Sequence, residues 1–186
     1  MLSRVKFAIG AALFGATLFL TGCATAARSD AMAASSVVAP VAANAPVALR
    51  GNIAIGDVAG GSSTNPLWVS KVGSAEFERA IEASLRGVGM LLPNRQAGNY
   101  RLIADLQKVD QPMIGLSFTV TSTVQYSLVE RISGRTIFNE RISTPFTAGI
   151  SDAFVGTERL KLANEGSIRV NIERLIERLS SLNISN

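Results

Sequence analysis

Alternating apolar and polar residues predict four β-strands along the chain. The clearest alternation runs from Phe118 to Glu130, where apolar side chains take most alternate positions and threonine, serine and glutamine lie between them. Such a strand has one packed face and one polar face, as in an antiparallel sheet covered by helices on one side. The other three strands are expected at Leu49–Val58, Tyr100–Val109 and Arg135–Ile142, the last of them ended by Pro145.

Apolar residues at helical spacing predict two amphipathic helices. One is expected from a cap at Ser74 to the glycines after Leu85, and the other begins between residues 152 and 157 and runs almost to the end. In the second helix, Glu165, Arg169 and Glu173 follow an i,i+4 spacing that we expect on the exposed side. The order β-α-β-β-β-α predicts a two-layer α+β fold, with both helices on one face of a four-stranded sheet.

The N-terminus has the pattern of a secretory signal. Arg4 and Lys6 precede an uncharged run of 14 residues, Phe7–Leu20. A helix that spans a bilayer needs about 20 apolar residues, so cleavage is favoured over a permanent span. The run ends in Leu20-Thr21-Gly22-Cys23, which contains the sole cysteine of the 186 residues.

Leu20, Thr21, Gly22 and Cys23 resemble the lipobox of bacterial lipoproteins. The resemblance implies cleavage before Cys23, a diacylglycerol on its sulfur and an acyl chain, such as palmitate, on its new amino group. No other cofactor is implied. Ala24 in place of aspartate implies an anchor in the outer membrane, with the protein facing the periplasm. The alternative is that Cys23 is a free or buried cysteine in a protein without lipid.

The segment after Cys23 is rich in alanine, with serine and proline and almost no charge. We interpret 23–48 as the lipidated cysteine and a flexible tether, with a typical span of about 25–30 Å. The alternative is that this segment packs on the domain. The boundaries are thus 1–22 for a signal peptide that is removed, 23–48 for the tether and 49–186 for a single periplasmic α+β domain.

Composition argues against catalysis and against nucleic acid. Without residues 1–22 the chain keeps 16 basic and 14 acidic residues, a side-chain charge of +2 (16 − 14), and the basic residues are spread out. The sequence has no histidine, which excludes a Ser-His-Asp arrangement and removes a preferred zinc ligand. Asp57 and Asp105 are the carboxylates to inspect, and we expect both to be solvated. We therefore expect neither an enzyme nor a metal site.

Three groups of residues are candidates for contact with a partner. Trp68, the sole tryptophan, is expected in a loop, where it could bind a partner or cover its own core. Three arginines near the last hairpin could bind lipid phosphates or an acidic protein, or could be solvated among nearby glutamates: Arg131, Arg135 and Arg141. The polar face of the third strand is the remaining candidate: Thr119, Thr121 and Thr123.

The layout resembles small outer-membrane lipoproteins of Gram-negative bacteria, namely the LPS-assembly lipoprotein LptE and the YajG-type lipoproteins. The similar stretches are the helix Phe77–Val88, the strands Tyr100–Val109 and Phe118–Glu130, and the C-terminal helix. The resemblance implies a non-catalytic lipoprotein that binds a protein or glycolipid partner in outer-membrane assembly, lipid transport or envelope maintenance. Alternatives are a lipoprotein regulator or activator of a peptidoglycan synthase, and an auxiliary lipoprotein of an ABC-type lipid transporter.

Overall fold

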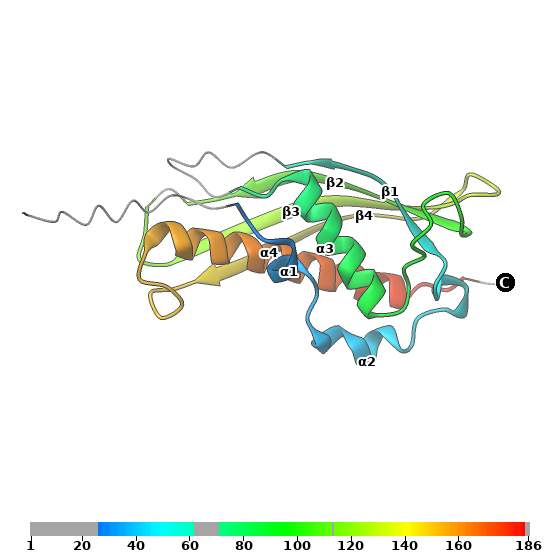
Figure 1. Ribbon diagram of the computed structural model, residues 1–186, viewed down its shortest axis with the longest axis horizontal. Coiled ribbons are helices and arrows are strands. Elements are labelled where there is room, and N and C mark those ends of the chain that lie inside the picture. Colours follow the sequence, from blue (N-terminus) through cyan, green and yellow to red (C-terminus); the bar gives the residue numbers. More distant parts are fainter. Residues whose placement is uncertain (1–25, 62–70, 113, 185–186) are drawn as a thin grey trace, which may run out of the picture.

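The computed structural model describes residues 26–61, 71–112 and 114–184. Leu20–Cys23 and Trp68 lie outside these residues. The main elements follow the expected β-α-β-β-β-α order, which confirms the α+β prediction (Figure 1). They are β1 (Ile53–Gly60), α3 (Ser74–Gly87), β2 (Tyr100–Asp110), β3 (Phe118–Glu130), β4 (Thr136–Ala148) and α4 (Gly156–Ser180). Short helical turns precede them: α1 (Ser29–Met32), η1 (Ser36–Val38), α2 (Ala39–Ala42) and η2 (Val47–Leu49).

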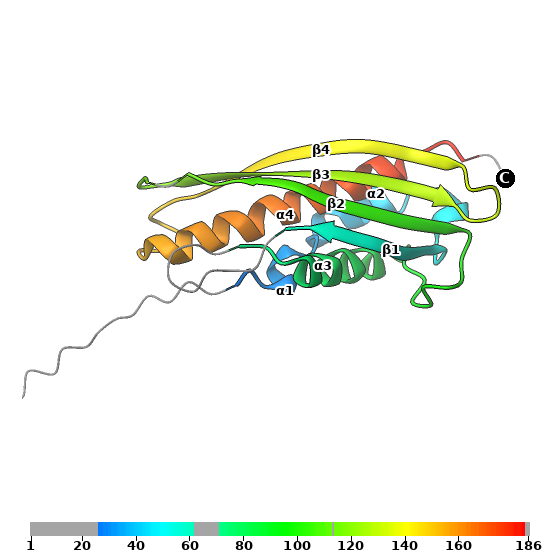
Figure 2. The same ribbon diagram turned by 90° about the horizontal axis from the view of Figure 1, so that it is seen from above.

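The sheet has the order β1-β2-β3-β4. β1 is parallel to β2, with α3 as the crossover, and the other two pairs are antiparallel. α3 and α4 lie on the same face of the sheet (Figure 2). Phe118 pairs with Ala148, so the β2–β3 loop and the β4–α4 loop lie at the same end of the sheet.

Three element boundaries differ from the expected ones. The first strand begins at Ile53 rather than at Leu49, because Val47–Leu49 form the short turn η2. The fourth strand does not stop before Pro145 but continues to Ala148, with Pro145 paired to Thr121. A proline is tolerated there because β4 is an edge strand, where one row of backbone donors needs no partner strand. The helix cap is Gly73 rather than Ser74, and the backbone N–H of Phe77 donates to the Gly73 carbonyl at 3.0 Å.

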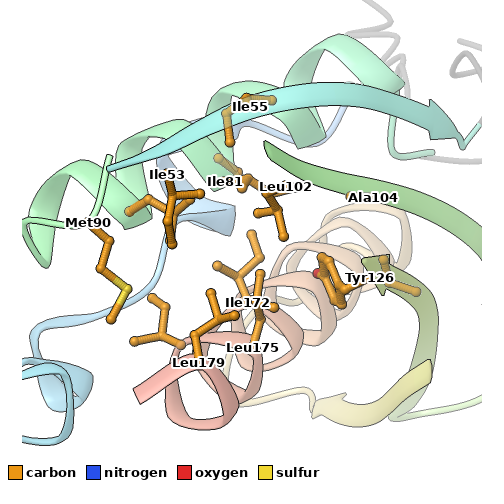
Figure 3. Packing of buried hydrophobic residues seen from close by; sticks show 14 of the residues in the cluster. Ile53, Ile55, Ile81, Met90, Leu102, Ala104, Tyr126, Ile172, Leu175 and Leu179 are labelled. Atoms are coloured by element: carbon orange, nitrogen blue, oxygen red, sulfur yellow. The ribbon is translucent and has the colours of Figure 1, made fainter. Parts of the chain in front are cut away.

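The core lies between the sheet and the two long helices (Figure 3). The Tyr126 hydroxyl donates to Oδ1 of Asn171 at 3.0 Å, and Nδ2 of Asn171 donates to the Ile142 carbonyl at 3.0 Å. Burial raises the pKa of Tyr126, so its phenol stays protonated as a donor. The same core contains apolar side chains from every layer: Ile53, Ile55, Phe77, Ile81, Leu85, Met90, Leu102, Leu128, Ile172, Leu175 and Leu179.

The segment 26–49, called the N-terminal strap below, is packed on the domain. Met32 and Leu49 are fully buried, and Val38, Ala42 and Ala45 are also in the core. The prediction of a flexible tether is therefore wrong for the part of 23–48 that the structure describes, and the packed alternative holds there. Large side chains are few in this segment, and its turn α1 contacts both α3 and α4.

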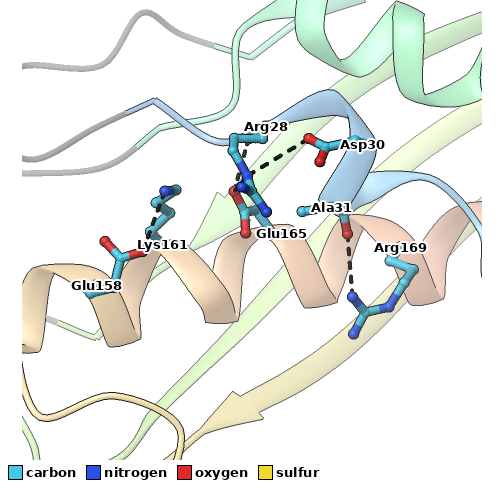
Figure 4. Close-up of polar contacts among 7 residues, drawn as sticks. All are labelled: Arg28, Asp30, Ala31, Glu158, Lys161, Glu165 and Arg169. Carbon is cyan, nitrogen blue, oxygen red and sulfur yellow. Dashed lines mark hydrogen bonds and ion pairs between the residues drawn. The ribbon is translucent and has the colours of Figure 1, made fainter.

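The strap also covers the face of α4 that was expected to be exposed. The backbone N–H of Arg28 donates to Oε1 of Glu165 at 2.8 Å, and Nη1 of Arg169 donates to the Ala31 carbonyl at 3.2 Å (Figure 4). Oε1 of Glu173 accepts from the backbone N–H of Ser35 at 2.9 Å. The expected exposed ladder of Glu165, Arg169 and Glu173 is thus a row of strap contacts. Arg28 and Ser35 each immediately precede a short helical turn, and their backbone N–H groups take acceptors from α4.

Candidate functional site

The face of the sheet opposite α3 and α4 is covered by no described helix (Figure 2). β3 alternates strictly there, with buried side chains toward the helices and exposed or half-buried ones away from them. β4 continues the same polar surface for its full length. We call this surface the outer sheet face, formed by Thr119, Thr121, Thr123, Gln125, Ser127, Asn139, Arg141, Ser143, Pro145 and Thr147.

Side chains of the outer sheet face pair across the two strands. The hydroxyl oxygens of Thr119 and Thr147 are 2.8 Å apart, and those of Thr123 and Ser143 are 3.0 Å apart. Nε2 of Gln125 donates to Oδ1 of Asn139 at 2.7 Å. These pairs fix the side chains in place while each hydroxyl keeps free hydrogen-bonding capacity. The arrangement suits hydrogen bonding to a polar surface.

The three candidate arginines lie at separate places. Nη2 of Arg131 donates to the Arg95 carbonyl, while Nη2 of Arg135 lies 3.6 Å from Oε2 of Glu130. Arg141 is exposed and lies on the outer sheet face, opposite Gln125 in the strand register. Arg135 and Arg141 are six residue steps apart along extended chain, a distance of about 20 Å. The structure therefore brings Arg141 together with the candidate threonines but not with the other two arginines.

The two aspartates singled out above lie on different strands. Asp57 is exposed on β1, and Asp105 is half-buried on β2, opposite Gln125. Among the described residues, no three histidine, cysteine, aspartate or glutamate side chains are grouped so that they could hold a metal ion.

An open hollow of about 660 Å³ lies where β1 ends beside β2. Nζ of Lys108, at its rim, lies 2.7 Å from Oδ1 of Asp110. Residues 62–70, which join two of its walls, are outside the described ranges, so this hollow adds no residue to the candidate site. Its described lining is Gly60, Gly61, Lys71, Val72, Asp105, Leu106, Gln107, Lys108, Val109 and Gln111.

Sequence reasoning missed part of the candidate surface. Asn139 lay within the expected fourth strand, but Ser143 and Thr147 lay at or beyond its expected end. The signal that could have found them is the continued alternation of Ile142, Thr144 and Ala148, whose side chains are buried. A proline within an edge strand interrupts no ladder, so the alternation was the better guide.

No described helix is both long enough and apolar enough to cross a membrane. α4 has the length, with 25 residues, but carries charged side chains in every turn.

Comparison of the sequence with family models and with curated proteins found no match. The fold does occur in solved structures. A Xanthomonas campestris protein of family DUF330 superposes with a TM-score of 0.53 at 11% identity, over 73% of this chain and 89% of that one. A hypothetical protein of Chlamydia trachomatis superposes with a TM-score of 0.50 at 11% identity, over 70% of this chain and 98% of that one. A minor lipoprotein of Acinetobacter baumannii superposes with a TM-score of 0.44 at 14% identity, over 71% of this chain and 92% of that one. At these identities the likeness shows the fold alone.

Proposed function

We propose that this chain is a non-catalytic lipoprotein, anchored by acyl chains on Cys23 in the outer membrane and facing the periplasm. The observation that carries the proposal is the order of the N-terminal residues: a basic start, a short apolar run, then Leu20-Thr21-Gly22-Cys23. One acyl chain binds a membrane marginally, and each buried CH₂ adds about 0.8 kcal/mol. A diacylglycerol together with an N-linked chain therefore holds the protein on the membrane.

The partner that we propose is an envelope protein or glycolipid, bound at the outer sheet face. The paired hydroxyls and amides there, with Arg141 among them, offer hydrogen bonds and one positive charge. Such a surface fits a role in outer-membrane assembly, in envelope maintenance or in lipid transport, where an ABC-type transporter could be the partner. A regulator that reaches peptidoglycan is disfavoured, because only four residue steps, about 14 Å, lead from Cys23 to Ala27, the first buried residue of the strap.

The anchor is tested by Cys23→Ser. We expect the precursor to remain uncleaved and to take up no labelled fatty acid, because serine offers no thiolate for the diacylglycerol. Thr25→Ser, which lies outside the lipobox, is the control and should be labelled normally. Normal labelling of the Cys23→Ser protein would rule out the anchor.

The partner surface is tested by a photo-crosslinking amino acid placed in cells at Thr119 or Arg141. Arg174, which is exposed on α4 in the other layer, is the matched control position. We expect adducts with an envelope protein or glycolipid from the two sheet positions and none from position 174. Equal or background yields at all three positions would contradict a role for the outer sheet face.

A further inference from the structure

Large apolar side chains are exposed together at one end of the molecule. They lie in the β2–β3 loop and in the β4–α4 loop, which the pairing of Phe118 with Ala148 places at the same end of the sheet (Figure 2). We call them the apolar tip: Ile114, Leu116, Ile150, Phe154 and Val155. Phe154 is 90% exposed and Ile114 is 92% exposed. The described residues include four other exposed large apolar side chains, three on the strap and Ile132 alone in the opposite hairpin.

The conformation that exposes Phe154 is held by buried groups. Nη1 of the buried Arg159 donates to the carbonyls of Ala153 and Phe154, both at 2.8 Å. The guanidinium of Arg159 also lies 5.4 Å from the centre of the Phe118 ring, a cation–π contact. Oδ2 of Asp152 accepts from the backbone N–H of Gly149 at 2.7 Å. The loop is therefore fixed by its own contacts while the Phe154 ring points outward.

Charges near the apolar tip compensate one another. Nζ of Lys108 lies 2.7 Å from Oδ1 of Asp110, and Nζ of Lys161 lies 3.3 Å from Oε1 of Glu158. Arg159 and Asp152 add one charge of each sign. Lys71, which lines the hollow at the same end together with Lys108, adds one further positive charge. The charges at this end therefore nearly cancel, and the small positive excess does not oppose contact with an anionic lipid interface.

The length of chain between Cys23 and Arg28 limits which end of the molecule the anchor can reach. The backbone N–H of Arg28 is bonded to Glu165, nine residues into α4 and so about 14 Å from the start of that helix. Five residue steps from Cys23 to Arg28 span at most about 17 Å. The end of α4 at Ser180 is 15 residues beyond Glu165, or about 22 Å. An anchor at Cys23 can thus reach the level of the apolar tip but not the level of the opposite end.

We propose that the apolar tip is a membrane-contact site, whose side chains enter the boundary between headgroups and acyl chains of the bilayer that holds Cys23. The inference rests on the proposed acylation of Cys23. The bilayer, rather than a protein, is the occupant because the anchor reaches this end and because the tip is apolar, with nearby charges that nearly cancel. In this orientation the two loops of the apolar tip contact the membrane, and the β3–β4 hairpin around Ile132 is directed away from it.

The test compares two positions of equal exposure at opposite ends. Phe154→Cys and Ile132→Cys replace side chains that are each 90% exposed, so neither change disturbs the core. Cys23 is blocked by its thioether in the lipidated protein, so the introduced cysteine is the sole free thiol for an NBD label. The labelled proteins are reconstituted into vesicles of phosphatidylethanolamine and phosphatidylglycerol that contain spin-labelled lipid. We expect a blue-shifted, quenched emission at position 154 and neither effect at position 132.

Three results would overturn the membrane contact. If the protein carries fatty acid but both positions are quenched equally, or neither is, the orientation is wrong and the anchor stands. If position 154 is shielded from aqueous iodide without quenching by lipid, a second copy or another protein covers the tip instead. If Cys23 carries no fatty acid, the proposed anchor fails and the orientation fails with it.

Discussion

The carboxylate of Glu165 is 2% exposed, and two opposing influences act on its pKa. Burial raises this pKa, whereas the hydrogen bond from the Arg28 N–H and the positive charges of Lys161 and Arg28 lower it, and burial prevails. Between the ordinary and the raised pKa, the folded state binds a proton that the unfolded state has released. The contribution of Glu165 to stability is thus greatest at acid pH and falls as pH rises through the folded pKa.

Glu165→Gln removes this pH dependence and keeps an oxygen that can accept from the Arg28 N–H. We expect the free energy of unfolding of the variant, relative to the unmodified protein, to increase from acid to neutral pH. Urea unfolding at a series of pH values measures the difference. Glu177→Gln, on the solvent side of α4, is the control and should give a difference that does not follow the same trend. If the difference in unfolding free energy between Glu165→Gln and the unmodified protein does not change with pH, the pKa of Glu165 is not raised by folding.

Single residues also show where the sequence pattern is insufficient. Pro145 was expected to end a strand, but an edge position tolerates it. Glu165 and Glu173 have the spacing of a solvated ladder, and no local signal distinguishes them from residues that bind backbone donors of another segment. The outer threonines, in contrast, were placed correctly because alternation alone determines which face of a strand they occupy.

At the scale of the element, the N-terminal strap is attached by a small number of polar contacts. Oε1 of Glu173 accepts from both the backbone N–H and the hydroxyl of Ser35, at 2.9 and 2.5 Å. The hydroxyl of Ser84 on α3 accepts from the Ala34 N–H at 2.8 Å. The strap thus joins α3 to α4, and loss of one acceptor should loosen it without unfolding the sheet.

Glu173→Ala tests this attachment. We expect a loss of about 1.5–3 kcal/mol in unfolding free energy, the usual value for hydrogen bonds to a charged group. Amide hydrogen exchange of residues 33–36 should accelerate, while the amides of β3 keep their protection. Glu173→Gln keeps an oxygen that can accept a hydrogen bond. Its unfolding free energy should therefore lie between those of Glu173→Ala and the unmodified protein. Unchanged exchange at Ser35 in Glu173→Ala would show that the hydrogen bonds do not hold the strap.

At the scale of the whole molecule, the sheet and its two helices could be predicted because their patterns are local. Each of β2, β3, α3 and α4 repeats its apolar period within its own residues, and the order of elements then restricts the topology. The strap could not be predicted, since alanine-rich sequence has no strong period and its partners lie 137 and 138 residues away. The apolar tip depends on the same long-range assembly, because two loops meet only when β3 and β4 pair.

The attachment of the strap to α4 also limits the order in which the chain can fold, and this order bears on the proposed processing at Cys23. The strap is synthesised first, whereas Glu165 and Glu173 belong to the last helix, so the strap cannot dock until almost the entire chain has emerged. Until then, we expect the bond before Cys23 to be accessible to the proposed processing enzymes, because the strap has no docking site. After docking, Cys23 is four residue steps from Ala27, the first buried residue of the strap. We therefore expect the folding of α4 to set the time available for processing and acylation.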